Sequence, residues 1–360
     1  MEVEDEIILD DDHDFLEIIE FGFPRKFYQR PNFLEEMDDL NFLKRFRLTK
    51  QATMSVLELI ENQLEFENDL NNSVSPINQL LTTLLFYASS SHQINVGDYM
   101  CMNQSTVSRI VKKVSQQIAA LRNQFIQMPT TPEEIISTQN KFYRVARFPR
   151  VIGCLDGTHV KIRSPGGEDS EVYRNRKSYF SINVQLVCDS DLKISNIVAR
   201  WPGSAHDATI FNNSRLKTLF EAGHFRSAIM LGDSGYGLKQ YLLTPLLNPI
   251  TRPQQLYNES HIRTRNCIER TNGVWKRRFP VLCYGLRCEM ETGLTIIVAT
   301  AVLHNIAINM RDDVPPPPND INAEELDYLI AQGQIPVINV NENINYDFRT
   351  DLINNHFANL

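Results

Sequence analysis

The spacing of apolar residues divides this chain into a helical first part and a strand-rich second part. Apolar residues recur at helical spacing over residues 33–70, Ser73–Pro76 interrupts the pattern, and residues 77–87 form a second apolar helix. The first 20 residues hold 10 acidic side chains and no Lys or Arg, which is typical of a disordered segment. We therefore expect a disordered acidic tail followed by a helical region.

A compact helical unit is predicted over residues 96–121. The pattern indicates a short helix at 96–102, a turn at 103–105 and a longer helix at 106–121 whose apolar residues share one face. A helix-turn-helix presents a helix to the major groove of DNA in this way. An ordinary three-helix bundle with a solvated basic face gives the same pattern, so both alternatives stay open. In the first alternative the DNA-contacting residues are Gln104, Ser105, Thr106, Arg109 and Lys112.

From residue 151 onward the pattern becomes that of strands. Apolar runs of strand length, strictly alternating segments and long helical segments follow one another. Their order predicts an α/β fold, an RNase H-like mixed-sheet catalytic domain preceded by an all-α, helix-turn-helix-like domain. The expected strands are 151–155, 158–163, 182–186, 194–201 and 228–232, and the expected helices are 205–222, 253–278 and 289–310.

Acidic residues stand at the ends of two predicted strands. Asp156 follows the apolar run 151–155, Asp233 follows the run 228–232, and Glu269 lies inside a predicted helix. If the two strands are neighbours, these aspartates lie about 5 Å apart and can share a metal ion. Mg²⁺ prefers oxygen ligands, and a pair of such ions supports cleavage of phosphate esters. Asp156, Asp233 and Glu269 are therefore the predicted catalytic residues and metal ligands.

The predicted helix around Glu269 carries a polar face. Arg265, Glu269, Asn272 and Lys276 share this face, because they are three or four residues apart. A metal-binding carboxylate beside the phosphate-binding cations Arg265 and Lys276 suits the pattern, and a salt-bridged surface face is the alternative. The aspartates on the strands favour the first interpretation. Asp207 is expected in the first turn of another helix, where metal binding and a favourable interaction with the helix dipole are both open.

Charge is distributed unevenly along the chain. Residues 141–311 hold 24 basic and 13 acidic side chains, an excess of 11, whereas residues 312–360 hold nine acids and one Arg. The basic excess favours a polyanionic ligand and disfavours a phosphohydrolase of small substrates. The longest apolar stretch, 294–308, is too short to cross a bilayer, so no membrane is expected. Bases alternate with aromatic residues before residue 180, which suits contact with nucleic acid through Arg174, Arg176 and Lys177.

Five segments of the chain resemble, in order, the PIF/Harbinger DDE transposases, and most closely the domesticated Harbinger transposase-derived nucleases of animals. The resemblance covers residues 76–311 and implies an RNase H-like domain that uses Mg²⁺ or Mn²⁺. It places the acidic set on Asp156, Asp207, Asp233 and Glu269, with Asp233 favoured for the catalytic triad and Asp207 as an added ligand. Asn272 and Trp275 replace the Phe and Leu that the family motif often has. The five segments are Gly153–Val160, Arg176–Gln185, Pro202–Asp207, Leu231–Tyr236 and Ile268–Lys276.

The resemblance also bears on partners and location. In this family a separate Myb/SANT-type protein often assists DNA binding and nuclear entry. The expected partners are therefore DNA, such a protein and further copies of this chain, and the expected locations are the nucleus and also the cytoplasm.

These patterns together predict four regions and a function. The regions are an acidic disordered tail at 1–30, a helix-turn-helix-like domain at 31–140, a DDE nuclease domain at 141–311, and an acidic, Asn-rich tail at 312–360 that is flexible or loosely helical. The predicted function is that of a metal-dependent DNA endonuclease that hydrolyses phosphodiesters, with strand transfer as an extension. The alternative is a domesticated DNA-binding or adaptor protein with a catalytically silent nuclease fold.

Overall fold

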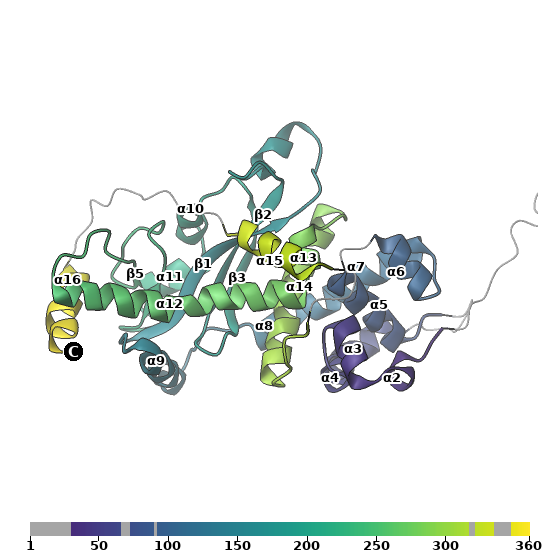
Figure 1. Cartoon of the computed structure of the whole chain (residues 1–360), viewed down its shortest axis with the longest axis horizontal. Helices are drawn as coiled ribbons and strands as arrows, with labels where there is room; N and C mark the ends of the chain where they lie inside the picture. Colours follow the sequence, from purple (N-terminus) through teal and green to yellow (C-terminus); the bar gives the residue numbers. More distant parts are fainter. Residues whose placement is uncertain (1–29, 66–72, 90–91, 317–320, 335–346) are drawn as a thin grey trace, which may run out of the picture.

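The computed structural model describes residues 30–65, 73–89, 92–316, 321–334 and 347–360. Apart from Arg30, the predicted acidic tail lies outside these residues. A mixed sheet lies near the middle of the molecule, with helices on both faces and an all-helical region at one end (Figure 1).

Five strands form the sheet in the order β3-β2-β1-β4-β5. β1 pairs antiparallel with β2 and parallel with β4, β2 pairs antiparallel with β3, and β4 pairs parallel with β5. The mixed α/β class is confirmed, and the sheet is consistent with a DDE nuclease domain. The strands are β1 (Val151–Lys161), β2 (Ser181–Cys188), β3 (Ile194–Pro202), β4 (Ile229–Leu231) and β5 (Leu242–Leu243).

β1 is one continuous strand of 11 residues, where the sequence pattern predicted two strands separated by a turn at Gly157. Gly157 is glycine for a different reason. A Cβ atom at this position would lie 2.2 Å from Oδ1 of Asp207, so the missing side chain leaves room for that carboxylate. The prediction of a turn at Gly157 was therefore wrong.

The long helix α12 (Arg252–Arg278) positions the residues of interest against the sheet. Its start is fixed by a capping box between Thr251 and Gln254, and it then runs across the face of the sheet beside β1 (Figure 1). Ile268, Thr271 and Trp275 are fully buried on its core side. The other helices of this half are η1 (Glu168–Tyr173), α10 (Asp207–Asn212), α11 (Arg215–Glu221), α13 (Val281–Tyr284) and α14 (Met290–Asn309).

Among the described residues, α14 is a helix long and apolar enough to cross a membrane by length and composition alone. Of its most apolar window, 72% is buried inside the protein, where α14 packs against β3 and α7. It therefore has the packing of a core helix.

Before β1, the regular secondary structure of the described residues is all helical. These helices do not form a separate core, because α7 contacts both α5 and α14, and one apolar cluster joins the two halves. The predicted boundary at residue 140 falls within α9, which packs against β1 and α12. The helix-turn-helix character of α6 and α7 stays a prediction. The helices are α2 (Phe33–Glu36), α3 (Asp39–Phe46), α4 (Lys50–Leu64), α5 (Pro76–Ala88), α6 (Gln93–Tyr99), α7 (Gln104–Ala120), α8 (Arg122–Phe125) and α9 (Pro132–Ala146).

The described parts of the C-terminal region, 321–334 and 347–360, are helical and pack onto the sheet domain. α15 (Ala323–Gln332) buries Leu326 and Ile330 against α13, because residues four apart share one face of a helix. α16 (Asp347–Asn355) and η2 (Phe357–Asn359) pack on α12, and the ring of Phe357 lies against Phe148 and Tyr257. A few apolar residues thus hold an acidic segment in place.

Candidate active site

Asp156 and Asp233 occupy corresponding positions on neighbouring parallel strands. Cys154 of β1 pairs with Leu231 of β4, and each aspartate lies two residues beyond its member of this pair. Asp156 is 7% exposed. Asp233 follows the end of β4, where its Oδ1 accepts a hydrogen bond of 2.9 Å from the backbone N–H of Gly235. The predicted adjacency of the two strands is confirmed.

The polar face of α12 meets Asp156, as its spacing predicted. One nitrogen of the Arg265 guanidinium lies 3.3 Å from Oδ1 of Asp156, and another lies 2.7 Å from Oε1 of Glu269. The side-chain amide of Asn272 donates to Oδ2 of Asp156 at 3.3 Å. Glu269 lies nearer the protein surface than Asp156, with 47% of its side chain exposed. Arg265 therefore lies between the two carboxylates and pairs with both.

Asp207 approaches β1 from the other side. It is the first residue of α10, and its Oδ1 accepts a hydrogen bond of 2.7 Å from the Asn183 side chain on β2. Its carboxylate lies against Gly157, the neighbour of Asp156. Because successive residues of a strand face opposite sides of a sheet, Asp207 and Asp156 lie on opposite faces of β1.

Burial and mutual repulsion raise the pKa values of the aspartates in the site. Burial raises the pKa of Asp156 to about 7, with Asp233, Asp207 and Glu269 adding to the rise and Arg265 opposing it. Burial likewise raises the pKa values of Asp207 and Asp233. Burial lowers the pKa of Arg265, but the three acids Asp156, Asp233 and Glu269 together hold it above its ordinary value. The pKa of Asp156 thus responds to the charges of each of the other three predicted acids.

A hard cation fits the chemistry of these donors, although the side chains do not converge on one point. Among the described residues, no three Asp, Glu, His or Cys side chains are placed to hold one metal ion. The donors are carboxylate oxygens, which Mg²⁺ and Mn²⁺ prefer. The amide oxygens of Asn183 and Asn272, next to Asp207 and Asp156, are buried without a hydrogen-bond partner in the described part of the chain. The assignment of the four acids as metal ligands stays a prediction, and it requires Arg265 to move aside.

Several predicted DNA contacts are already engaged within the protein. Lys276 is 1% exposed and its ammonium donates to the carbonyl of His159 at 2.8 Å, so the prediction that it contacts DNA was wrong. Helical spacing correctly placed Lys276 on the polar face of α12 but did not indicate that its side chain is buried. Lys177 donates to the carbonyls of Gln332 and Gln334, each at 3.0 Å, in the folded-back C-terminal region.

The remaining predicted contacts lie nearer the surface. The Arg174 guanidinium pairs with Glu171 at 2.7 Å and lies over the Phe180 ring, whereas Arg176 lies 2.5 Å from the ring of His206. On α7, the first turn is exposed at Gln104 and Ser105 and half-buried at Thr106. Arg109 bonds the backbone of Ser105, Lys112 lies 3.5 Å from Glu289, and Gln104 bonds the side chain of Gln93.

Three features of the site were not predicted from the sequence. They are the contact of Asn183 with Asp207, the hydrogen bond from Asn272 to Asp156, and the packing of Asp207 on Gly157. Asn183 does lie within the segment Arg176–Gln185 that carries the family resemblance. Its position beside Asp207 depends on the register of β2 against β1, which pairs it with His159.

Comparison with known proteins identifies the family of the chain. Residues 155–305 match the family described as DDE superfamily endonuclease. The chain is 33% identical to the Homo sapiens protein named "Putative nuclease HARBI1" over 291 residues, covering 78% of this chain and 81% of the relative. This chain belongs to the Harbinger transposase-derived nuclease family. The resemblance read from the five sequence segments is thereby confirmed.

More distant relatives match over similar lengths. The Xenopus laevis protein of the same name is 27% identical over 357 residues, covering 98% of this chain and 94% of the relative. The Arabidopsis thaliana protein named "Protein ALP1-like" is 26% identical over 312 residues, covering 81% of this chain and 75% of the relative. No solved structure gives a significant match.

Proposed function

We propose that this member of the Harbinger transposase-derived nuclease family is a metal-dependent DNA endonuclease of the DDE type. The observation that carries the proposal is the buried Asp156 on β1, with Asp233 just beyond the end of the neighbouring parallel strand β4 and Glu269 of α12 linked to Asp156 through Arg265. Asp156, Asp233 and Glu269 are the proposed holders of Mg²⁺ or Mn²⁺. Asp207, on the other face of β1, is proposed as an added ligand and would have to move to reach the same ion. Held by these carboxylates, a divalent ion would supply activation of a water or 3′-hydroxyl and stabilisation of the leaving oxygen.

Asp156 and Arg265 determine the net charge of the site. Asp156 must release its proton before it can act as a ligand, and its pKa of about 7 places that step in the neutral range. Arg265 holds the carboxylates together while they lack another cation. If another cation balanced the charge of these carboxylates, the Arg265 guanidinium would be available to pair with a phosphodiester oxygen. Guanidinium groups bind phosphate in the same way as carboxylate.

DNA is the proposed substrate because residues 141–311 carry an excess of 11 basic side chains. A Myb/SANT-type partner, assembly with further copies of the chain, and residence in the nucleus and cytoplasm belong to the same proposal. They are supported by the family alone.

A plasmid-nicking assay tests the proposal. Wild-type protein should nick supercoiled DNA with Mg²⁺ or Mn²⁺, and Asp233→Asn and Glu269→Gln should each lose more than the roughly 10- to 100-fold typical of residues outside the metal's own ligands. Glu259→Gln is the matched control, because Glu259 lies on the same helix and pairs with Arg263 at the surface. Equal nicking by all four proteins would contradict the proposal.

A second candidate function is DNA binding by a catalytically silent nuclease fold. The observation that favours it is the Arg265 guanidinium between Asp156 and Glu269, since a permanent internal counter-ion would keep a metal out. This candidate predicts salt-dependent binding of DNA and no nicking by wild-type protein with either metal.

A further inference from the structure

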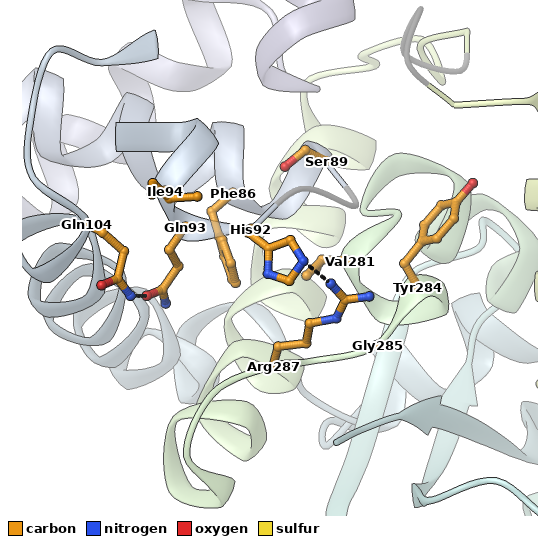
Figure 2. A pocket seen from close by; sticks show the side chains of 10 residues that line it. All are labelled: Phe86, Ser89, His92, Gln93, Ile94, Gln104, Val281, Tyr284, Gly285 and Arg287. Atoms are coloured by element: carbon orange, nitrogen blue, oxygen red, sulfur yellow. Dashed lines mark hydrogen bonds between the residues drawn. The ribbon is translucent and has the colours of Figure 1, made fainter. Parts of the chain in front are cut away.

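Three adjoining cavities form a groove where the helical half of the molecule meets the far end of β1. The largest, of about 730 Å³, lies between α7 and the segment that follows α13. Two others, of about 500 and 270 Å³, adjoin it, and Arg287 lines all three. Figure 2 shows the smallest of them, in which the Arg287 side chain points toward His92 of the helical half. We call this combined space the junction groove.

The junction groove is lined by an excess of positive charge. Its walls carry Lys161, Arg163 and Arg287 from the sheet half and Arg109 and Lys112 from α7. Glu289 is the one acidic side chain among the described lining residues, and it pairs with Lys112 at 3.5 Å.

The cations of the sheet half are held in place by the backbone beneath them. The carbonyl of Lys161 accepts from the N–H of Leu286 at 2.9 Å, and the N–H of Arg163 donates to the carbonyl of Leu286 at 3.1 Å. Lys161 and Arg163 are two residues apart on extended backbone, so their side chains leave on the same side. Gly285, with a φ of 113°, lies against the stem of Lys161, where a Cβ would be 3.2 Å from its Cγ.

These cations are available to a ligand. Lys161, Arg163 and Arg287 are exposed, and the side chains of Lys161 and Arg163 make no hydrogen bond or ion pair with any other residue that the structure describes. Arg287 lies 2.6 Å from a ring nitrogen of His92 and has no carboxylate partner among the described residues. Charged groups of one sign along an extended groove suit an extended polyanion better than a single small anion, which one or two of them would satisfy.

The groove lies at a defined distance from the proposed cleavage site. Lys161 and Arg163 follow Asp156 by five and seven residues along β1 and its extension. At about 3.3 Å per residue, their Cα atoms lie about 17 and 23 Å from that of Asp156 along the strand, and their side chains leave the strand on the face opposite to that of Asp156. Phosphates of one DNA strand repeat every 3.4 Å or so along the helix axis, so this span corresponds to about five to seven nucleotides.

We propose that the junction groove binds the sugar-phosphate backbone of the DNA about five to seven nucleotides from the phosphodiester that is cut. This inference rests on the proposed DNA substrate, but not on catalytic activity. The groove binds phosphate without reading base sequence on its sheet side, while the first turn of α7 faces the same DNA from the helical side. The binding energy is therefore electrostatic and strongly dependent on salt.

Binding of a fluorescent 30-base-pair duplex by the full chain, in EDTA so that no cleavage occurs, tests the inference. The groove variant combines Lys161→Gln, Arg163→Gln and Arg287→Gln. The control variant combines Arg144→Gln, Arg215→Gln and Arg226→Gln, which are exposed and lie outside the groove, so that both variants lose three positive charges. The groove variant should bind at least about tenfold more weakly at 100 mM salt, with its slope of log Kd against log salt reduced by about 2 to 3, since each neutralised phosphate accounts for roughly 0.9. The control variant should keep the wild-type slope.

Equal slopes in the two variants, or no binding of duplex by the wild-type protein, would overturn the inference. Tighter binding of a labelled acidic peptide copying residues 1–20 than of the duplex would overturn it as well, because the groove would then serve an acidic segment. Melting curves check that both variants fold. The nicking assay separates this inference from the proposed function: groove-dependent binding without nicking refutes the nuclease alone, and unchanged nicking and affinity in the groove variant refutes the groove alone.

Discussion

Replacement of Asp156 by Asn should stabilise the metal-free protein at alkaline pH. The wild-type carboxyl has its pKa raised from 3.8 to about 7, chiefly by burial. Between pH 4 and 7 the folded chain keeps a proton that the unfolded chain has released, so stability falls as pH rises through this range. One pKa unit corresponds to 1.36 kcal/mol, and a shift of about three units amounts to about 4 kcal/mol of lost stability above pH 7.

The amide introduced by Asp156→Asn would not recover all of this. An amide has one acceptor oxygen, whereas the Asp156 carboxylate accepts from both Arg265 and Asn272. One buried donor left without an acceptor costs about 1 to 3 kcal/mol. The expected gain at pH 8 is therefore about 2 kcal/mol, and near pH 5, where the wild-type carboxyl is protonated, the substitution should be neutral or destabilising.

Urea unfolding at pH 5, 6, 7 and 8 in EDTA measures this difference. Asp191→Asn is the control, because Asp191 lies in an exposed turn where it pairs with Lys141 at 2.6 Å. A stability difference between Asp156→Asn and wild type that stays constant from pH 5 to pH 8 would refute the assigned burial penalty. Added Mg²⁺ should stabilise the wild type at pH 8 and leave Asp156→Asn unchanged.

Other substitutions test the packing around the site. Gly157→Ala should destabilise the protein by about 1 to 3 kcal/mol in urea unfolding, because its Cβ would overlap the Asp207 carboxylate; an unchanged midpoint would mean that α10 shifts freely. Lys276→Met should alter thermal stability without weakening DNA binding, since its ammonium is buried; a weaker Kd in the duplex assay would contradict this. Leu326→Ala should cost about 2 to 5 kcal/mol of local stability and speed proteolysis within α15, and equal cleavage rates would show that α15 is not held by its core.

Much of the sheet and its acids could be predicted from local pattern. β1 and β4 form at the apolar runs 151–155 and 228–232, and Asp156 and Asp233 come directly after these runs, although β1 continues beyond Asp156 to Lys161. The polar face of α12 follows from helical spacing, and Arg265 and Asn272 do contact β1 from it. These features are local consequences of strand and helix period, which a single sequence displays.

The features that escaped prediction depend on contacts between distant segments. Gly157 has the composition of a turn, but its role is set by Asp207, 50 residues later in the chain. Helical spacing places Lys276 on the correct face and cannot say that α15 and Gly333 cover it. The acidic, Asn-rich composition beyond residue 312 conceals the few apolar residues, such as Leu326 and Ile330, that hold α15 in place.

A backbone hydrogen bond to a residue near the C-terminus covers the edge of β1 close to Asp156. The N–H of His159, three residues beyond Asp156, donates to the carbonyl of Gly333 at 2.9 Å, beyond the last pairing of β1 with β4. A nascent chain that has reached only residue 300 therefore presents an uncovered strand edge, of the kind that invites pairing with other chains. Ribosomes stalled before residue 333, or messages truncated there, should yield a protein prone to aggregation rather than a smaller folded protein.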